Sequence, residues 1–182
     1  MNTKDIVYIS LFAALVAVLG LIPAIMLPTG IPITAQSLGV MLAGTILGAK
    51  RGGLAVLLFI VLVALGLPLL SGGRGGLGVF VSPTAGFVVG FPIAAFATGY
   101  LMERLPIEKI GIAAGIAAVI GGIFVLYICG IVGFSIVMGK SIWVSTLAMS
   151  PYIPGDFLKA LVAGSLTQAI FAARPQSVLS KQ

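Results

Sequence analysis

The sequence predicts an all-α fold: a polytopic membrane protein built as a bundle of six transmembrane helices. Of its 182 residues, 60% are hydrophobic and only 8% are charged. The mean hydropathy is +1.26, which is typical of chains that reside in a bilayer rather than in water. The apolar residues form six runs, and most basic residues lie between alternate pairs of these runs. A chain of this length has room for one integral-membrane domain, residues 1–182, and for no second unit.

The first predicted helix covers Ile6–Met26, an apolar run of spanning length. It is longer than the core of a signal peptide and leads into more apolar chain, so we expect an uncleaved helix. Pro23 and Pro28 should kink and then end it, with a loop at 29–32. The second and third helices are expected at Ile33–Ala49, which stops at Lys50-Arg51, and at Leu54–Leu70.

A glycine-rich loop at 71–82, with Arg74 inside it, separates the third predicted helix from the fourth. Residues 135–150 mix polar and apolar side chains, and this pattern predicts an interfacial loop or a short amphipathic helix. A polar tail follows the last apolar run. The remaining helices are expected at 83–102, 108–134 and 151–173.

The distribution of basic residues predicts which end of the bundle faces the cytoplasm. Six spans place both termini on one side of the membrane. The opposite loops hold only Arg74 and Lys140. Because cytoplasmic loops carry an excess of Lys and Arg, both termini are predicted to be cytoplasmic, and the loop at 71–82 is predicted to lie outside. The basic residues on the terminal side are Lys4, Lys50, Arg51, Arg104, Lys109, Arg174 and Lys181.

Asp156 and Lys159 are two opposite charges at the start of the sixth predicted helix. Three residues apart on a helix, they share one face. An ionisable residue in hydrocarbon costs about 2.5–3.5 kcal/mol on insertion scales, so such residues usually face a cavity and serve a function. The alternative is that Asp156 only stabilises the first helical turn, with Lys159 as its partner. The functional interpretation predicts a charged pocket that opens outward and captures a solute from outside the cell.

The residue types present disfavour several classes of protein. The chain has no histidine and one cysteine, Cys129, so neither a nucleophile–base pair nor a metal cluster is predicted. We therefore expect no enzyme and no cofactor. The segment 73–78 fits the G-x-G-x-x-G spacing of dinucleotide sites, but no strand precedes it. The basic residues do not cluster with aromatic ones, so no nucleic-acid partner is predicted.

Four sequence blocks occur in order, namely 32–40 (PITAQSLGV), 72–78 (GGRGGLG), 82–87 (SPTAGF) and 154–159 (PGDFLK). Together they resemble the BioY family, the substrate-binding S components of biotin transporters of the energy-coupling factor (ECF) type. The resemblance covers residues 5–173 and departs from the family pattern at Ala85, where glycine is expected. It implies a prokaryotic cell-membrane protein that binds biotin with high affinity and delivers it with a transmembrane T component and two ATPase subunits.

The resemblance also implies which residues line the biotin pocket, with the glycine-rich loop closing over it. The Asp156 carboxylate can accept hydrogen bonds from the urea N–H groups of biotin. Lys159, as the first choice, or Arg74 can neutralise the valerate carboxylate. From the residues alone, the polar candidates near the second helix could equally bond a neighbouring helix. The candidate pocket residues are Asp156, Lys159, Arg74, Thr34, Gln36 and Phe87.

Two further interpretations concern the surface of the bundle. Ala13 and Ala17 fall on the A-x-x-x-A surface of the first helix, which the resemblance implies docks the T component. The aromatic residues Phe87, Tyr152 and Trp143 are more commonly interfacial anchors than stacking partners. An alternative function is a stand-alone proton-coupled secondary carrier for a small carboxylate, with Asp156 as the proton relay. The absence of an inverted repeat argues mildly against that alternative.

Overall fold

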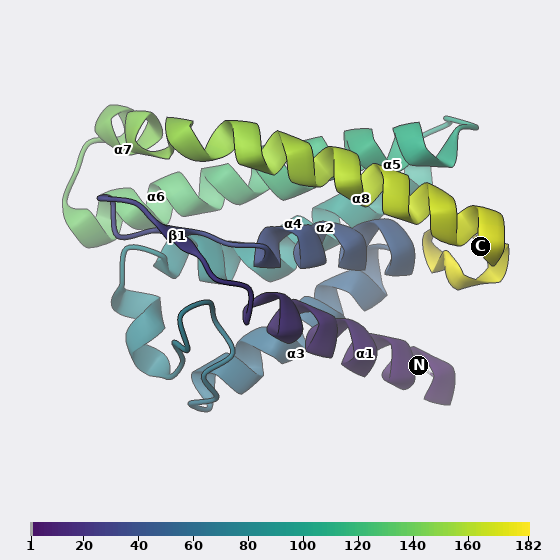
Figure 1. Cartoon of the computed structure of the whole chain (residues 1–182), viewed down its shortest axis with the longest axis horizontal. Coiled ribbons are helices and arrows are strands. Elements are labelled where there is room, and N and C mark those ends of the chain that lie inside the picture. The colour runs from purple at the N-terminus through teal and green to yellow at the C-terminus, as the bar shows by residue number, and fades with distance from the viewer. Residues whose placement is uncertain (1) are drawn as a thin grey trace.

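The computed structural model describes residues 2–182 and is predominantly helical, which confirms the predicted all-α class (Figure 1). One small antiparallel sheet joins β1 (Ile25–Met26) to β2 (Pro32–Ile33), with Ile25 opposite Ile33. A π-helical turn at Ile120–Val125 makes α5 and α6 one continuous rod. The helices are α1 (Thr3–Leu19), α2 (Gln36–Leu47), α3 (Ala49–Ala64), α4 (Ala85–Arg104), α5 (Ile110–Val119), α6 (Leu126–Met138), α7 (Ile142–Met149) and α8 (Ile153–Ala173).

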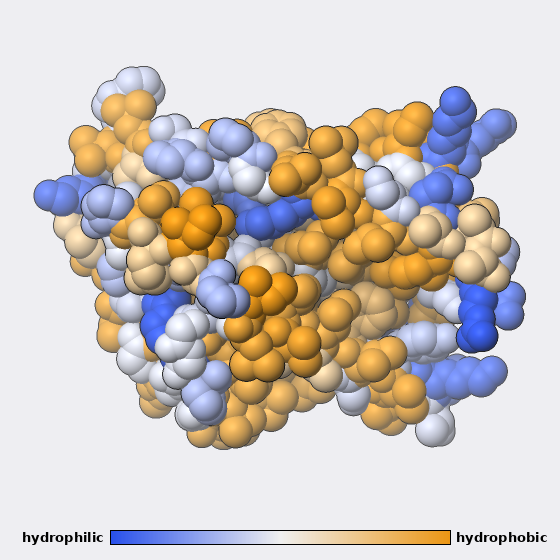
Figure 2. Space-filling model, viewed as in Figure 1, coloured by the Kyte–Doolittle hydropathy of each residue, from blue (hydrophilic) through white to orange (hydrophobic). Residues whose placement is uncertain are grey.

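Membrane-spanning character is clearest in the second half of the chain. Within residues 2–182, three helical segments are long and apolar enough to cross a bilayer: Ala85–Arg104, Ile110–Met138 and Ile142–Ala173. Figure 2 shows a broad hydrophobic band across the middle of one face, with hydrophilic side chains gathered mainly toward its ends. An exterior this apolar fits lipid rather than water.

The first helix is shorter than predicted, because α1 ends at Leu19 rather than at Met26. Gly20 lies where three segments meet: a Cβ atom there would sit 2.5 Å from the Leu69 carbonyl oxygen and 2.8 Å from Gln36 Nε2. The apolar residues that follow leave the helix and form the β1–β2 hairpin. Hydropathy alone could not show where the helix ends and the hairpin begins, since both segments are apolar.

The second and third helices are also displaced from their predicted limits. Gly48 ends α2 with a φ of +84°, a left-handed conformation that favours glycine, and α3 begins at the next residue. Lys50 and Arg51 therefore lie in the first turn of α3 and not in a loop. Arg51 uses this position to form an ion pair with Asp5 of α1, at 2.6 Å.

Close helix packing explains several of the glycines. A Cβ atom on Gly86 of α4 would lie 2.3 Å from the Cys129 carbonyl oxygen of α6, and one on Gly99 would lie 2.3 Å from the Ala49 nitrogen of α3. Small residues at such contacts let the backbones of neighbouring helices approach directly. Gly115 of α5 differs, because a Cβ atom there would meet nothing within 4 Å. That position borders an open groove.

The two ends of the bundle differ in character. Figure 1 places both termini at one end, whereas α7 and the β1–β2 hairpin lie at the other. The short helix α7 matches one of the two structures predicted for 135–150, and its Trp143 is 71% exposed. The last predicted helix agrees closely with α8. This arrangement places the start of α8, where the acid–base pair lies, at the end that carries α7 and the β1–β2 hairpin.

Candidate functional site

Asp156 lies in the first turn of α8, behind Pro154, and is buried at 7% exposure. Proline is well tolerated at the start of a helix, where the missing N–H has no intrahelical partner. The Asp156 carboxylate accepts three hydrogen bonds, from Ser37 Oγ at 3.1 Å, Tyr127 OH at 2.6 Å and Lys159 Nζ at 2.8 Å. Three different helices, α2, α6 and α8, therefore converge on one buried carboxylate.

Lys159 completes a closed polar cluster around this carboxylate. Its ammonium group also donates to Ser37 Oγ at 3.0 Å, so Ser37, Asp156 and Lys159 bond one another in a ring. The side chains of Lys159 and Asp156 are 18% and 10% exposed. Buried ions of opposite sign need such pairing, because an unpaired charge in a low-dielectric interior is costly. The pair as a whole is electrically neutral.

A small cavity of about 70 Å³ lies beside this cluster. Its walls come from the β2 segment and the start of α2, the glycine-rich loop, α4, α6 and α8. The structure brings all six predicted pocket residues to its lining, together with several apolar side chains. Two cations, Arg74 and Lys159, and one anion, Asp156, give this lining a formal charge of +1.

Arg74 is held at the cavity by the tight turn of the glycine-rich loop. Leu70 and Arg74 exchange two backbone hydrogen bonds, at 3.0 and 3.2 Å. This turn requires left-handed backbone at Gly72 and Gly73. The guanidinium donates to the Ser71 carbonyl and to Thr84 Oγ1, both at 3.3 Å. Burial lowers the pKa of Arg74, yet a guanidinium stays protonated at neutral pH. Arg74 is thus a charged group with only neutral partners.

Gln36 and Thr34 line the cavity, but their side chains form hydrogen bonds with backbone groups of the protein. Gln36 is 2% exposed. Its Nε2 donates to the carbonyls of Val16 and Leu69, and its Oε1 accepts from the Ser71 N–H at 3.0 Å. Thr34 Oγ1 accepts from the Gln36 N–H at 3.3 Å. Through these hydrogen bonds, Gln36 of α2 connects α1 to the loop that carries Arg74.

Aromatic side chains form one wall of the cavity. Phe87 of α4 packs edge-on against Tyr127 of α6, with ring centroids 5.9 Å apart. Tyr152 is buried at 7% exposure and donates to the Ile31 carbonyl at 2.7 Å, while its hydroxyl also meets Thr29 Oγ1. The interpretation of Phe87 and Tyr152 as interfacial anchors is therefore wrong. Both belong to the interior, where Tyr152 ties the β1–β2 segment to the start of α8.

The sequence-based search missed Ser37 and Tyr127, which both donate to the central carboxylate. A signal for Tyr127 was available, because a phenol in the middle of the longest apolar run must find a hydrogen-bond partner. Ser37 gave no comparable signal, since a helical serine can bond its own backbone. Only the three-dimensional arrangement shows that it faces α8.

The predicted docking pair on α1 is largely covered by the chain's own bundle. Ala13 is 4% exposed and packs in the core, while Ala17 is partly buried. The exposed small residues on this helix are Ser10 and Ala14, one turn apart. They lie among exposed aliphatic side chains such as Leu11 and Val18, at 58% and 59%. A partner helix that approaches α1 from the lipid side meets this face.

These features define a class of protein: a membrane-embedded helical bundle with a small, partly polar cavity near one end. Throughout residues 2–182, no three Cys, Asp, Glu or His side chains gather closely enough to hold a metal ion. The cavity instead offers hydrogen-bond donors, the Asp156 carboxylate as an acceptor and the Arg74 guanidinium, which has no acidic partner in the described part of the chain, beside aromatic side chains. This combination suits recognition of a neutral polar group and a carboxylate on one molecule.

The chain belongs to the BioY family, whose model matches residues 1–176. Among curated relatives, the biotin transporter BioY of Rhodobacter capsulatus is 50% identical, with 98% of each chain covered. The biotin transporter BioY of Rhizobium etli is also 50% identical, covering 96% of this chain and 97% of the relative. A solved crystal structure, the S component for biotin from an ECF-type ABC transporter, superimposes with a TM-score of 0.87. That structure is 27% identical and covers 94% of this chain and 95% of its own.

Proposed function

We propose that this chain is the high-affinity biotin-binding S component of an ECF-type transporter, a membrane subunit that captures biotin from outside the cell. The observation that carries the proposal is the cavity in which a neutral acid–base pair and an uncommitted arginine lie a short distance apart. Support comes from the match with biotin transporters at 50% identity. The family is one of transporters, and this chain carries out uptake rather than catalysis.

The acid–base cluster is proposed to bind the urea ring of biotin. The urea presents N–H donors and one carbonyl acceptor, so it needs both an acceptor and a donor from the protein. Asp156 supplies the acceptor, and the Lys159 ammonium, 2.8 Å from it, supplies donors. Because the pair is neutral, a neutral ring binds there without leaving a net charge buried. Ser37 and Tyr127 fix the carboxylate in place before the ligand arrives.

Arg74 is proposed to bind the valerate carboxylate, in preference to Lys159. The Lys159 charge is already balanced by Asp156, whereas Arg74 contacts only a carbonyl and a hydroxyl, both at 3.3 Å. A monoanionic ligand would therefore neutralise the +1 charge of the lining by pairing with Arg74. The planar guanidinium matches a carboxylate in two-point geometry.

Ligand entry is proposed to move the glycine-rich loop, residues 71–82, away from the bundle. The cavity of about 70 Å³ is smaller than the roughly 300–1,000 Å³ of pockets that hold small ligands. Arg74, within this segment, and Thr84, two residues after it, both line the cavity. Left-handed glycines at 72, 73 and 76 allow the tight turn that returns Arg74 to the closed position.

A six-span topology with both termini in the cytoplasm agrees with this direction of capture. The proposed spans are α1, α2, α3, α4, the α5–α6 rod and α8, within a single domain. Helices α1 and α3, at 17 and 16 residues, are close to the lower limit of about 17 residues for a span, whereas α2, at 12 residues, is shorter than that limit. Both termini lie at one end of the bundle (Figure 1), and that end carries most of the basic residues, as the positive-inside rule requires.

Binding of biotin is expected to stabilise the purified protein against heat in detergent. A ligand at 100 times its dissociation constant adds about 2.7 kcal/mol to the free energy of unfolding when it binds only the folded state. Thermal unfolding of the wild type with and without biotin measures this shift. Lys140→Ala, which changes an exposed loop lysine, should give the same shift. A wild type whose unfolding temperature does not respond to biotin, yet responds to another vitamin, would overturn the substrate assignment.

Delivery of biotin is proposed to require a T component and two ATPase subunits, with α1 as a docking helix. The exposed face of α1 around Ser10 and Ala14 lies beside the predicted Ala13–Ala17 surface and is proposed as the docking face in its place. Close approach of a partner helix needs small side chains at the contact. The Ala13 face itself is already occupied by the chain's own core.

Ala14→Trp is expected to weaken assembly with the T component at least tenfold while biotin binding stays unchanged. The indole would hold a partner helix away from the α1 backbone. Co-purification of the co-expressed subunits measures assembly, and the thermal shift with biotin shows that the variant is folded. Ile128→Trp, on a 65% exposed position of α6, serves as the matched control. Full assembly of Ala14→Trp would contradict docking through this face.

A further inference from the structure

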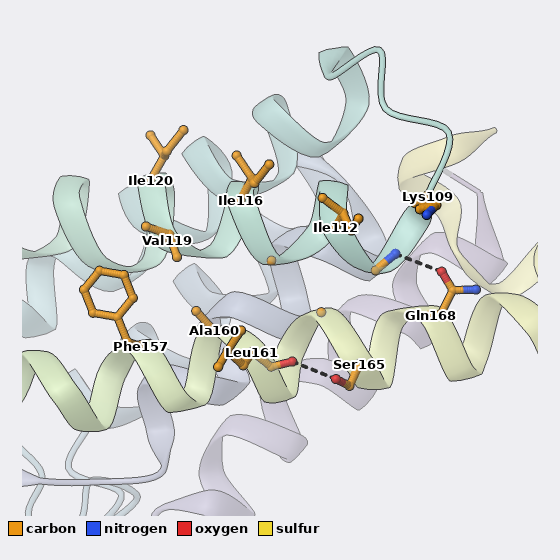
Figure 3. Close-up of a pocket in the computed structure, with 13 residues that line it drawn as sticks. Lys109, Ile112, Ile116, Val119, Ile120, Phe157, Ala160, Leu161, Ser165 and Gln168 are labelled. Carbon is orange, nitrogen blue, oxygen red and sulfur yellow. Dashed lines mark hydrogen bonds between the residues drawn. The ribbon is translucent and has the colours of Figure 1, made fainter.

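A second concavity lies between α5 and α8, outside the acid–base cavity, and has a volume of about 860 Å³ (Figure 3). Its floor consists of glycines where the two helices touch. A Cβ atom on Gly164 would lie 2.7 Å from the Gly111 carbonyl oxygen, whereas one on Gly115 would meet nothing within 4 Å. Aliphatic side chains from α5 and α8, such as Ile112, Ile116 and Leu161, line the groove. The groove is therefore apolar, and it is deepest at the glycines because these have no side chain to fill it.

The two ends of this groove differ in polarity. Figure 3 shows Lys109 and Gln168 at one end and Phe157 at the other. The Gln168 carbonyl accepts from the Gly111 N–H at 2.9 Å, so its amide nitrogen stays available as a donor. Lys109 forms no ion pair within residues 2–182. Among the described residues that line the groove, Lys109 is the only charged one, and the exposed Glu108 precedes it without lining the groove. The end of the groove at Lys109 therefore carries a positive charge.

The length of the groove matches one leaflet of a bilayer. Lys109 and Ile120 both line it, and at about 1.5 Å per residue they are about 16 Å apart along the helix axis. Half of a hydrocarbon core about 30 Å thick is about 15 Å. Lys109 lies two residues before Gly111, which bonds Gln168 near the C-terminal end of α8. That end of the bundle holds both termini (Figure 1), and a lysine at a helix terminus there reaches the headgroup layer. The groove thus extends from the headgroups to about the bilayer centre.

We propose that this groove is a binding site for one anionic phospholipid from the leaflet on the side of the termini. The lipid phosphate lies against Lys109 and the Gln168 amide. One acyl chain follows Ile112, Ile116 and Leu161 toward Phe157. Charge complementarity selects an anionic headgroup, because a basic residue at the membrane surface attracts acidic lipids. The glycine floor lets the chain lie close to the backbone of both helices.

A second copy of this chain fits the groove less well than a lipid. Copies inserted in the same direction are related by a twofold axis along the membrane normal, so residues near that axis meet their own equivalents. A dimer formed through this groove would bring Lys109 close to Lys109 of the partner subunit. Like charges facing each other are unfavourable, whereas an anionic lipid neutralises the same charge.

Native mass spectrometry of the purified protein in detergent tests this site. Equal amounts of phosphatidylglycerol and phosphatidylcholine with identical acyl chains are added as probes. The wild type is expected to retain more phosphatidylglycerol, and Lys109→Gln should lower the ratio of the two bound lipids at least fivefold. Gly115→Phe, which fills the open part of the groove, should lower retention of both lipids. Lys140→Gln and Ile128→Phe, on an exposed loop and an exposed face of α6, are the matched controls and should change nothing.

Biotin-dependent thermal stabilisation is measured on every variant, so that a folding defect or a failure of the biotin site is recognised separately. The proposal is overturned if the wild type retains both lipids equally, or if Lys109→Gln leaves the ratio unchanged. It is also overturned if the wild type forms dimers that Gly115→Phe abolishes while lipid retention persists. That last result would assign the groove to a second copy.

Discussion

Asp156→Ala is expected to lower biotin affinity at least tenfold and to destabilise the ligand-free protein. The substitution removes the acceptor for three donors, from Ser37, Tyr127 and Lys159. It also leaves the ammonium of Lys159, whose side chain is only 18% exposed, without its counter-ion. Breaking a buried ion pair by removing one partner typically costs about 3–5 kcal/mol. Equilibrium binding of biotin and thermal unfolding without ligand measure the two effects.

The double variant Asp156→Ala/Lys159→Ala separates ligand binding from structural stabilisation. Removing both charges avoids an unpaired buried ion, so the double variant should be more stable than Asp156→Ala alone. Its biotin affinity should nevertheless remain at least tenfold below that of the wild type, as should that of Lys159→Ala. If the pair only stabilises the start of α8, the double variant will regain affinity together with stability. That outcome would remove both residues from the proposed urea site.

The acid–base pair was predictable because a charge in an apolar run is conspicuous. Asp156 and Lys159 stand out in a chain in which 8% of residues are charged, and their three-residue spacing already implied a shared helix face. The structure adds their burial and the convergence of α2 and α6 on the same carboxylate. No local pattern encodes that convergence, since it joins residues 119 positions apart in the case of Ser37.

Helix limits were less predictable than helix existence. Apolar composition continues past Gly20, yet α1 ends beside this glycine, where the chain segments meet closely. Helix α2 ends beside Gly48 because the backbone there is left-handed. The same limitation affected α1, where the repeat of small residues was recognised but its inward direction was not. Ala13 packs into the core. Hydropathy cannot distinguish a lipid-facing side from a core-facing side when both are apolar.

Gln36 shows why a pocket residue need not contact the ligand. Its amide joins the carbonyls of Val16 and Leu69 to the Ser71 N–H. Leu69 and Ser71 flank Leu70, whose backbone forms two hydrogen bonds with that of Arg74. The position of the Arg74 guanidinium therefore depends on Gln36 through a short series of backbone contacts. A site built this way holds its charged group in a fixed direction before the ligand binds.

Arg74→Gln is expected to weaken biotin binding by about 10–100-fold, because a charge-assisted hydrogen bond contributes about 1.5–3 kcal/mol and each 1.4 kcal/mol is tenfold. The affinity for biotin methyl ester, which has no charged carboxylate, should change little in the same variant. Arg74→Lys keeps the charge but not the two-point geometry, so it should recover part of the loss. Titration calorimetry of the three proteins with both ligands measures the difference. Equal losses for biotin and its ester would contradict pairing between Arg74 and the valerate group. If Lys159→Ala instead abolished the discrimination between the two ligands, the carboxylate would belong to Lys159.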